Sequence, residues 1–137
     1  MSLQLIPDLH RATHRVGVYL ENVEPGLTQG EAHLLAHLHA QGYCSIAELH
    51  RALAHKRSTL TSLLDRLEGR GFTTREVSST DRRSFLIRLT RAGRLAAARV
   101  HAALSNFELA ALARVTPAEV EGFRAVLAAL GGNSGSE

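Results

Sequence analysis

Two adjacent arginines in the segment "SSTDRRSFLIRLT", residues 78–90, have the chemistry to bind a nucleic acid. Arg82 and Arg83 follow Asp81 directly and precede an apolar run. At the tip of a β-hairpin, one of them could enter the narrow minor groove of DNA, where the negative potential is strongest. Asp81 can hold that guanidinium through a bidentate pair, which reduces the entropy lost on binding. A lone turn of this composition is more often a solvated loop, so the interpretation depends on the surrounding elements.

The segment upstream predicts a helix over residues 57–70 whose two sides differ in chemistry. Its buried stripe is formed at helical spacing by Leu60, Leu63, Leu64 and Leu67. Small hydroxyls flanked by arginines occupy the other side, which suits a helix in a major groove because hydroxyls and guanidinium groups bond to base edges and phosphates. The alternative is an ordinary solvated helix face. The candidate DNA-binding residues are Arg57, Ser58, Thr59, Thr61, Ser62, Arg66, Arg75, Asp81, Arg82 and Arg83.

Positive charge is concentrated in this part of the chain. The 137 residues carry a formal net charge of +3. Residues 57–94 contain nine arginines and four acidic residues, a local net charge of +5, so the rest of the chain carries −2. A basic middle with mildly acidic ends favours a module that binds a polyanion. Phosphates would repel Asp65 on the candidate helix, so we expect it to pair with Arg66 or with an arginine of the hairpin.

Apolar periodicity and capping residues predict the elements that position these side chains. Helices are expected over residues 3–23, between Thr28 and Gly42, over 46–53, 57–70 and 91–113, and from Thr116 to Leu130. Strands are expected over 72–78 and 84–90, with a loop between them. Capping boxes are expected at Thr28, Ser45 and Thr116, each followed three residues later by Glu, and Thr90 can cap the long helix. Residues 132–137 are expected to be a disordered tail.

Two compact helices followed by a hairpin form a winged helix-turn-helix, so we expect a mainly α fold with a small β-hairpin. Aromatic residues make up only 4% of the chain, which favours a leucine- and alanine-rich helical core. We expect no membrane span and no secretory signal, and the single cysteine, Cys44, fits a reducing cytoplasm. The sequence lacks a G-x-S-x-G motif, a glycine-rich phosphate loop and a metal-ligand motif, so we expect neither an enzyme nor a cofactor.

The stretch "STLTSLLDRLEGRGFTTREVSSTDRRSFLIRLTRAGR" resembles the MarR (multiple antibiotic resistance regulator) family of bacterial transcription factors. The matching features are S-T-x-T at the start of the helix, D-R-L-E-x-R-G at its end, the D-R-R turn, and L-T-x-x-G-R after the second strand. The resemblance is strongest over residues 27–95. Each piece is weak alone, but their joint pattern is specific.

The resemblance implies a homodimer that binds a pseudo-palindromic operator in double-stranded DNA, most often as a repressor. Residues 27–90 would form the winged-helix lobe, and the helices of 1–26 and 91–131 would intertwine with those of the partner. Carried over by position, Arg83 would enter the minor groove with Asp81 as its buttress. Ser62 departs from the family pattern, since many relatives carry arginine there.

The family also implies an effector, because many members release DNA when a small molecule binds near the dimerisation helices. Candidate lining residues are His14, Tyr19, His37 and Phe107. Other relatives sense oxidants through a cysteine in the first helix, but here that helix has none and Cys44 is expected to be a buried structural residue.

Two alternatives stay open at this stage. The pairs His10/His14 and His33/His37 are spaced i, i+4, so each could hold a metal ion in a metal-responsive regulator, although surface histidines are the simpler explanation. A protein-interaction module that binds an acidic partner through its basic hairpin is the other alternative. The dependence of affinity on salt would separate DNA binding from this module.

Overall fold

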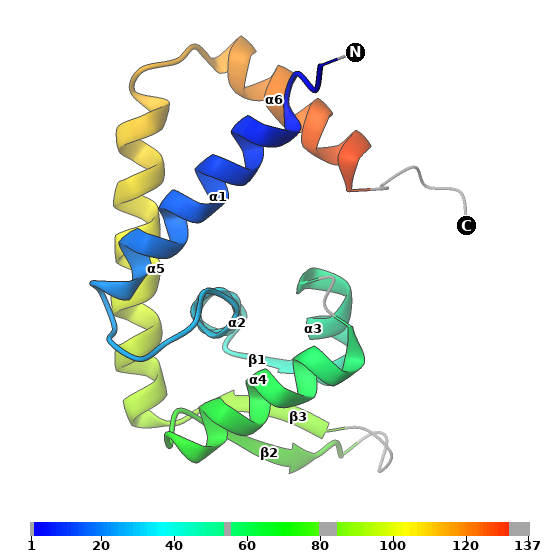
Figure 1. Ribbon diagram of the computed structural model, residues 1–137. Helices are drawn as coiled ribbons and strands as arrows, with labels where there is room; N and C mark the ends of the chain where they lie inside the picture. Colours follow the sequence, from blue (N-terminus) through cyan, green and yellow to red (C-terminus); the bar gives the residue numbers. More distant parts are fainter. Residues whose placement is uncertain (1, 54–55, 80–84, 132–137) are drawn as a thin grey trace. The chain divides into compact units, whose positions relative to one another are not determined.

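The computed structural model describes residues 2–53, 56–79 and 85–131, which fall into two compact units. The first unit is Met1–Ala103 and the second is Leu104–Glu137, so α5 contributes residues to both. In chain order the elements are α1 (Ile6–Glu21), α2 (Gln29–Gln41), β1 (Tyr43–Ser45), α3 (Ile46–Leu53), α4 (Arg57–Gly69), β2 (Thr73–Val77), β3 (Phe85–Leu89), α5 (Arg91–Leu112) and α6 (Pro117–Leu130) (Figure 1). None of these helices has both the length and the apolar character needed to cross a membrane.

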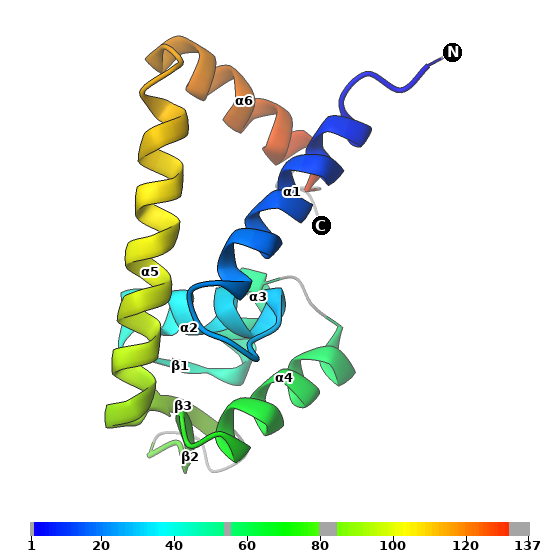
Figure 2. The same ribbon diagram turned by 60° about the vertical axis from the view of Figure 1, so that its left-hand side comes forward.

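Leucines of three helices form the core of the first unit. The four α4 leucines predicted to form a buried stripe are each at most 3% exposed, which confirms the orientation of this helix. Leu34, Leu35 and Leu38 of α2 and Leu49 of α3 are completely buried as well. Burial of one such side chain contributes roughly 1.5–3 kcal/mol. In Figures 1 and 2, α3 is followed by α4, and the β2–β3 hairpin leaves from the end of α4. The predicted winged helix-turn-helix is therefore present.

The hairpin of β2 and β3 is the wing of this fold. It is part of a three-stranded antiparallel sheet with strand order β1-β3-β2. β2 and β3 pair from end to end, from Thr73 opposite Leu89 to Val77 opposite Phe85 beside the connecting segment, so the predicted hairpin is confirmed. β1 was not predicted from the sequence; it pairs with β3 and places Cys44 opposite Ile87. A strand of three residues is too short to show an alternating pattern, and β1 exists only because the chain leaving α2 runs beside β3.

Short polar side chains begin most of the helices, as predicted. Their side-chain oxygen accepts a hydrogen bond of 3.0 to 3.2 Å from the backbone N–H three residues later, at Thr28, Ser45, Thr90 and Thr116. The capping box is complete at Thr116, where the carboxylate of Glu119 accepts from the backbone N–H and the hydroxyl of the cap. These bonds favour the charged carboxylate and lower the pKa of Glu119.

α1 is shorter than predicted, because it begins at Ile6 rather than at residue 3 and ends at Glu21 rather than at residue 23. Pro7 lies in its first turn, where a missing N–H costs no helical hydrogen bond. The prediction extended through Leu5 because that residue continues the apolar spacing. In the structure Leu5 is the N-cap and is 51% exposed.

A close approach between α5 and the turn after α4 explains the L-T-x-x-G motif. The backbone N–H of Thr90 donates to the carbonyl oxygen of Phe72 at 3.0 Å. Gly93 then lies so near this carbonyl that a Cβ built on it would overlap the Phe72 oxygen. Only a residue without a side chain allows this contact, which joins the start of α5 to the start of the hairpin.

Cys44 is a core residue of the sheet rather than a surface thiol. It is 1% exposed, and the structure leaves it as a free cysteine. Burial, together with the nearby carboxylate of Glu48, raises the pKa of its thiol above the ordinary value. At neutral pH the thiol is therefore protonated, and the thiolate is the form that reacts with oxidants. The expectation of a buried structural cysteine is confirmed.

The substitution Gly93→Ala should destabilise the protein, because its methyl group would overlap the Phe72 carbonyl oxygen. We expect a loss of about 1–3 kcal/mol or more in the free energy of unfolding, measured by urea denaturation. Gly122→Ala is the control, since a Cβ at this α6 position meets nothing within 4 Å. That control should leave stability unchanged or raise it by up to about 1 kcal/mol. Equal stability of wild type and Gly93→Ala would contradict the close contact.

The Cys44 thiol should react slowly with a disulfide reagent such as DTNB in the folded protein. Its burial blocks access, and its raised pKa keeps the thiolate population small at neutral pH. In denaturant the rate should rise to that of a free cysteine, at least about tenfold faster. A native rate equal to the denatured rate would show that the thiol is accessible.

Candidate nucleic-acid interface

α4 presents the hydroxyl-rich side that the sequence predicts. Ser58, Thr59, Thr61 and Ser62 are all exposed, while the leucines of the same helix are buried. The hydroxyl of Thr61 donates to the backbone carbonyl of Arg57 at 3.0 Å, so its oxygen can still accept a hydrogen bond from a ligand. Lys56, the N-cap, is extended and its side chain makes no capping hydrogen bond. The first turn of α4 therefore has backbone N–H groups that suit a phosphate.

Arg75 joins the wing to α4. From β2 its guanidinium forms ion pairs with Asp65 and with Glu68, the latter at 3.0 Å. The expectation that Asp65 pairs with an arginine of the hairpin is confirmed, and this pair offsets part of its negative charge beside the hydroxyl-rich side. With two carboxylates on its guanidinium, Arg75 holds the two candidate DNA-binding elements together. Its predicted contact with DNA stays a prediction.

Arg66, another predicted DNA contact, is tied to a buried acid. Its Nε atom donates to Oε1 of Glu31 at 2.7 Å, and the Glu31 side chain is only 3% exposed. From the T-x-x-E pattern, Glu31 was predicted to be the capping-box partner of Thr28. The backbone N–H of Glu31 does bond to Thr28, but its carboxylate reaches across to α4. No local sequence pattern signals this contact, because the two partners lie 35 residues apart.

The three residues of the D-R-R turn, Asp81, Arg82 and Arg83, lie outside the described residues. β2 and β3 flank this segment, and their last described pair is Val77 with Phe85. Both side chains are largely exposed, at 56% and 40%. The minor-groove role of Arg83 and the buttress role of Asp81 stay predictions.

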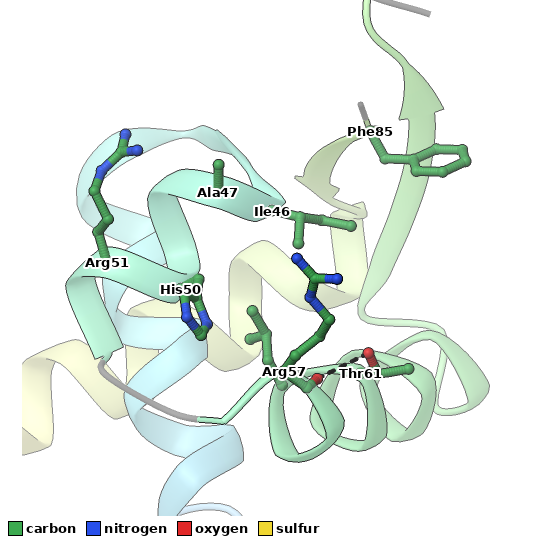
Figure 3. Close-up of a pocket in the computed structure, with 8 residues that line it drawn as sticks. Ile46, Ala47, His50, Arg51, Arg57, Thr61 and Phe85 are labelled. Carbon is green, nitrogen blue, oxygen red and sulfur yellow. Dashed lines mark hydrogen bonds between the residues drawn. The ribbon is translucent and has the colours of Figure 1, made fainter. Parts of the chain in front are cut away.

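A cavity of about 370 Å³ lies where α3, the start of α4 and the start of β3 meet. Its lining residues are Ile46, Ala47, His50, Arg51, Arg57, Leu60, Thr61 and Phe85. Figure 3 shows the Arg57 guanidinium extending from α4 toward Ile46 of α3. His50 and Arg51 are exposed basic residues beside the predicted DNA-binding helix that the sequence analysis did not include. Two adjacent basic residues in a short helix were the sequence signal that could have identified them. The sequence interpretation gave α3 only a structural role.

The four predicted effector-pocket residues belong to different units. His14, Tyr19 and His37 lie in the first unit and Phe107 lies in the second. None of them lines the cavity beside Arg57, nor a second cavity of about 360 Å³ at the end of α2. The proposed pocket therefore stays a prediction. Among the described residues, no three His, Cys, Asp or Glu side chains gather as they would around a metal ion.

Comparison with known proteins identifies the relatives of this architecture. The family model described as MarR family matches residues 27–85. A comparison with curated protein sequences gave no match. A probable transcriptional regulator from Pseudomonas aeruginosa is 29% identical in sequence, covers 93% of this chain and 97% of its own, and has a TM-score of 0.73.

Two further structures share the fold at lower identity. S. aureus MepR in complex with DNA is 22% identical, with a TM-score of 0.76 and coverage of 93% of this chain and 92% of its own. Bordetella bronchiseptica BpsR, whose DNA binding is regulated by 6-hydroxynicotinic acid, is 23% identical, with a TM-score of 0.71 and coverage of 93% and 99%. Together with the shared fold, the match over residues 27–85 makes this chain similar to the MarR family of winged helix-turn-helix transcriptional regulators.

Proposed function

We propose that this protein is a homodimeric repressor that binds a pseudo-palindromic operator in double-stranded DNA and works in the cytoplasm. α4 lies in the major groove, and the hairpin tip with Arg83 enters the adjacent minor groove. The observation that carries this proposal is the pair of bonds from Arg75 to Asp65 and Glu68, which hold the wing against α4. Two elements joined in this way meet a duplex together.

The acidic residues of the basic segment support the same function. Asp65 and Glu68 pair with Arg75, and Glu76 pairs with Arg88 at 2.9 Å. Each of these carboxylates is therefore bonded to a neighbouring arginine, which lowers the repulsion that it exerts on a phosphate. The hydroxyl-rich side of α4 and Arg57 then meet the DNA backbone with less repulsion than unpaired carboxylates would cause.

Exposed apolar side chains in the terminal helices support a dimer. The second unit exposes Leu109, Leu112, Val115, Phe123, Leu127 and Leu130, each by at least 39%. No residue of α6 is buried in the single chain. Apolar surface of this extent in adjacent helices is the mark of a subunit interface. We assign 1–26 and 91–131 to dimerisation and 27–90 to DNA binding, with recognition helices roughly 34 Å apart on the operator.

A small-molecule effector is the regulatory part of the proposal. BpsR, which shares the fold, is regulated by 6-hydroxynicotinic acid. In this protein His14, Tyr19, His37 and Phe107 remain the candidate contacts. Binding of an effector would release the operator by favouring a conformation in which the two lobes no longer match the spacing of the DNA.

The substitution Ser62→Glu should strongly weaken operator binding without disturbing the fold. Glutamate is a good helix former and Ser62 is exposed, so the α4 core is unaffected. On the proposed face, the new charge would meet phosphates, and we expect affinity to fall about 100-fold. The measurement is fluorescence anisotropy with an operator obtained by selection from random DNA.

Gln41→Glu is the matched control, because it adds the same charge at an exposed position at the end of α2. It should change operator affinity by less than about threefold. Wild-type affinity must also fall with salt by roughly 0.9 log units per log unit for each phosphate contact. Undiminished binding by Ser62→Glu would refute the orientation of α4 on DNA.

Phe123→Glu should weaken the proposed dimer. Phe123 is 55% exposed in the single chain, and its replacement would bury a charge in the apolar dimer interface. The wild-type mass in light scattering should be twice the 14.8 kDa of the chain. The variant should approach the single-chain mass at micromolar concentration. Glu121→Gln, at an exposed polar position of α6, serves as the control. A wild-type protein that is monomeric would remove the dimer from the proposal.

A further inference from the structure

Glu31 is the one charged residue that the described part of the chain buries. It lies in the first turn of α2 and is 2% exposed. Its carboxylate accepts a 2.7 Å hydrogen bond from Nε of Arg66, whose own side chain is 52% exposed. An ion pair with one buried partner adds little net stability, because the buried carboxylate loses its hydration. The pair therefore invites an explanation other than stability.

The exposed end of Arg66 lies beside the hydroxyl-rich side of α4. Arg66 follows Ser62 by four residues, so the two side chains are neighbours on the helix surface. Glu31 takes the Nε donor, and the guanidinium carries four further N–H bonds on its two Nη atoms. In a bidentate arrangement these atoms suit a phosphate. The carboxylate thus fixes the plane of the guanidinium from inside the protein.

Contacts beside the Glu31–Arg66 pair also hold α4 in its orientation. At the C-cap of α4, Nη2 of Arg70 donates to the carbonyl oxygen of Pro25 at 3.2 Å. A Cβ built at Gly30 would lie 3.1 Å from Leu63 Cδ2, so the first turn of α2 already packs tightly on α4. Rotation of α4 about its axis would break these contacts together with the bond from Arg66 to Glu31.

We propose that Glu31 is a positioning residue for DNA recognition, which holds Arg66 in place to bind a phosphate at the edge of the groove that α4 occupies. This inference rests on the proposed function and names a residue that determines the specificity of the same site. Removal of the carboxylate leaves Arg66 as a mobile cation. Such a cation still attracts any DNA, but it no longer favours the operator.

The test compares operator and scrambled DNA for wild type and Glu31→Gln. Glutamine keeps the shape of the side chain and offers a carbonyl oxygen to Arg66, while the negative charge is removed. We expect the ratio of operator to scrambled affinity to fall about tenfold. Affinity for scrambled DNA should stay equal or rise, because the net charge becomes more positive. A purely structural loss would lower both affinities equally, and thermal melting would show it as partial unfolding.

Glu24→Gln is the matched control, because Glu24 is also a poorly exposed carboxylate that pairs with an arginine, Arg99 of α5, at 2.7 Å. It lies outside the proposed DNA-binding face, so the specificity ratio should not change. The double variant Glu31→Gln/Arg66→Gln leaves no buried unpaired charge. It tests whether Glu31 affects specificity through Arg66. Its ratio should match that of Glu31→Gln within about twofold.

Three outcomes overturn the inference. The first is an unchanged ratio in Glu31→Gln, and the second is an equal loss for operator and scrambled DNA in a folded variant. The third is a much larger loss of specificity in the double variant, since Arg66 would then act without Glu31. If wild-type protein shows no preference for any selected duplex, the proposed function itself fails, and this result is distinct from the other three.

Discussion

Burial of the four α4 leucines is the constraint on which the rest of the site depends. A helix has one rotational setting about its axis that places these side chains in the core, and each is at most 3% exposed. The same setting turns Ser58, Thr61 and Ser62 to the surface. Exposure of the hydroxyl side is therefore a consequence of apolar burial. A recognition surface built this way is only as well defined as the core beneath it.

Polar contacts refine the orientation that the leucines set. Arg75 of the wing forms an ion pair with Asp65 of α4. Because Asp65 is 62% exposed, solvent and salt weaken this ion pair. The Glu31 carboxylate is 3% exposed and is screened far less. Of the two contacts, the buried one constrains α4 more strongly, although its net contribution to stability is small.

Local patterns predicted the elements but could not predict their partners. The spacing of four leucines identified the buried side of α4, and a hydroxyl three residues before a glutamate identified helix starts such as Thr116. The strand at Tyr43–Ser45 was missed because its only reason to be extended is β3, which lies more than 40 residues later. The role of Glu31 was incomplete for the same reason, since a capping-box position says nothing about a carboxylate that crosses to another helix. Of the candidate site, the side of α4 was predictable, whereas the ion pairs that hold it depend on tertiary contacts.

These ion pairs also change what the charge of the sequence means. Residues 57–94 contain nine arginines, and a count alone would assign all of them to phosphates. In the structure Arg66, Arg75 and Arg88 are each bonded to a carboxylate, and Arg70 donates to a backbone carbonyl. The three arginines bonded to carboxylates displace fewer counterions from DNA than free ones, because a carboxylate already offsets part of their charge. The salt dependence of binding should therefore reflect fewer contacts than the arginine count of this segment. The composition of residues 57–94 indicates that this segment binds a polyanion. The pairing of its charges determines how much positive charge is left to attract the polyanion, and where on the surface that charge lies.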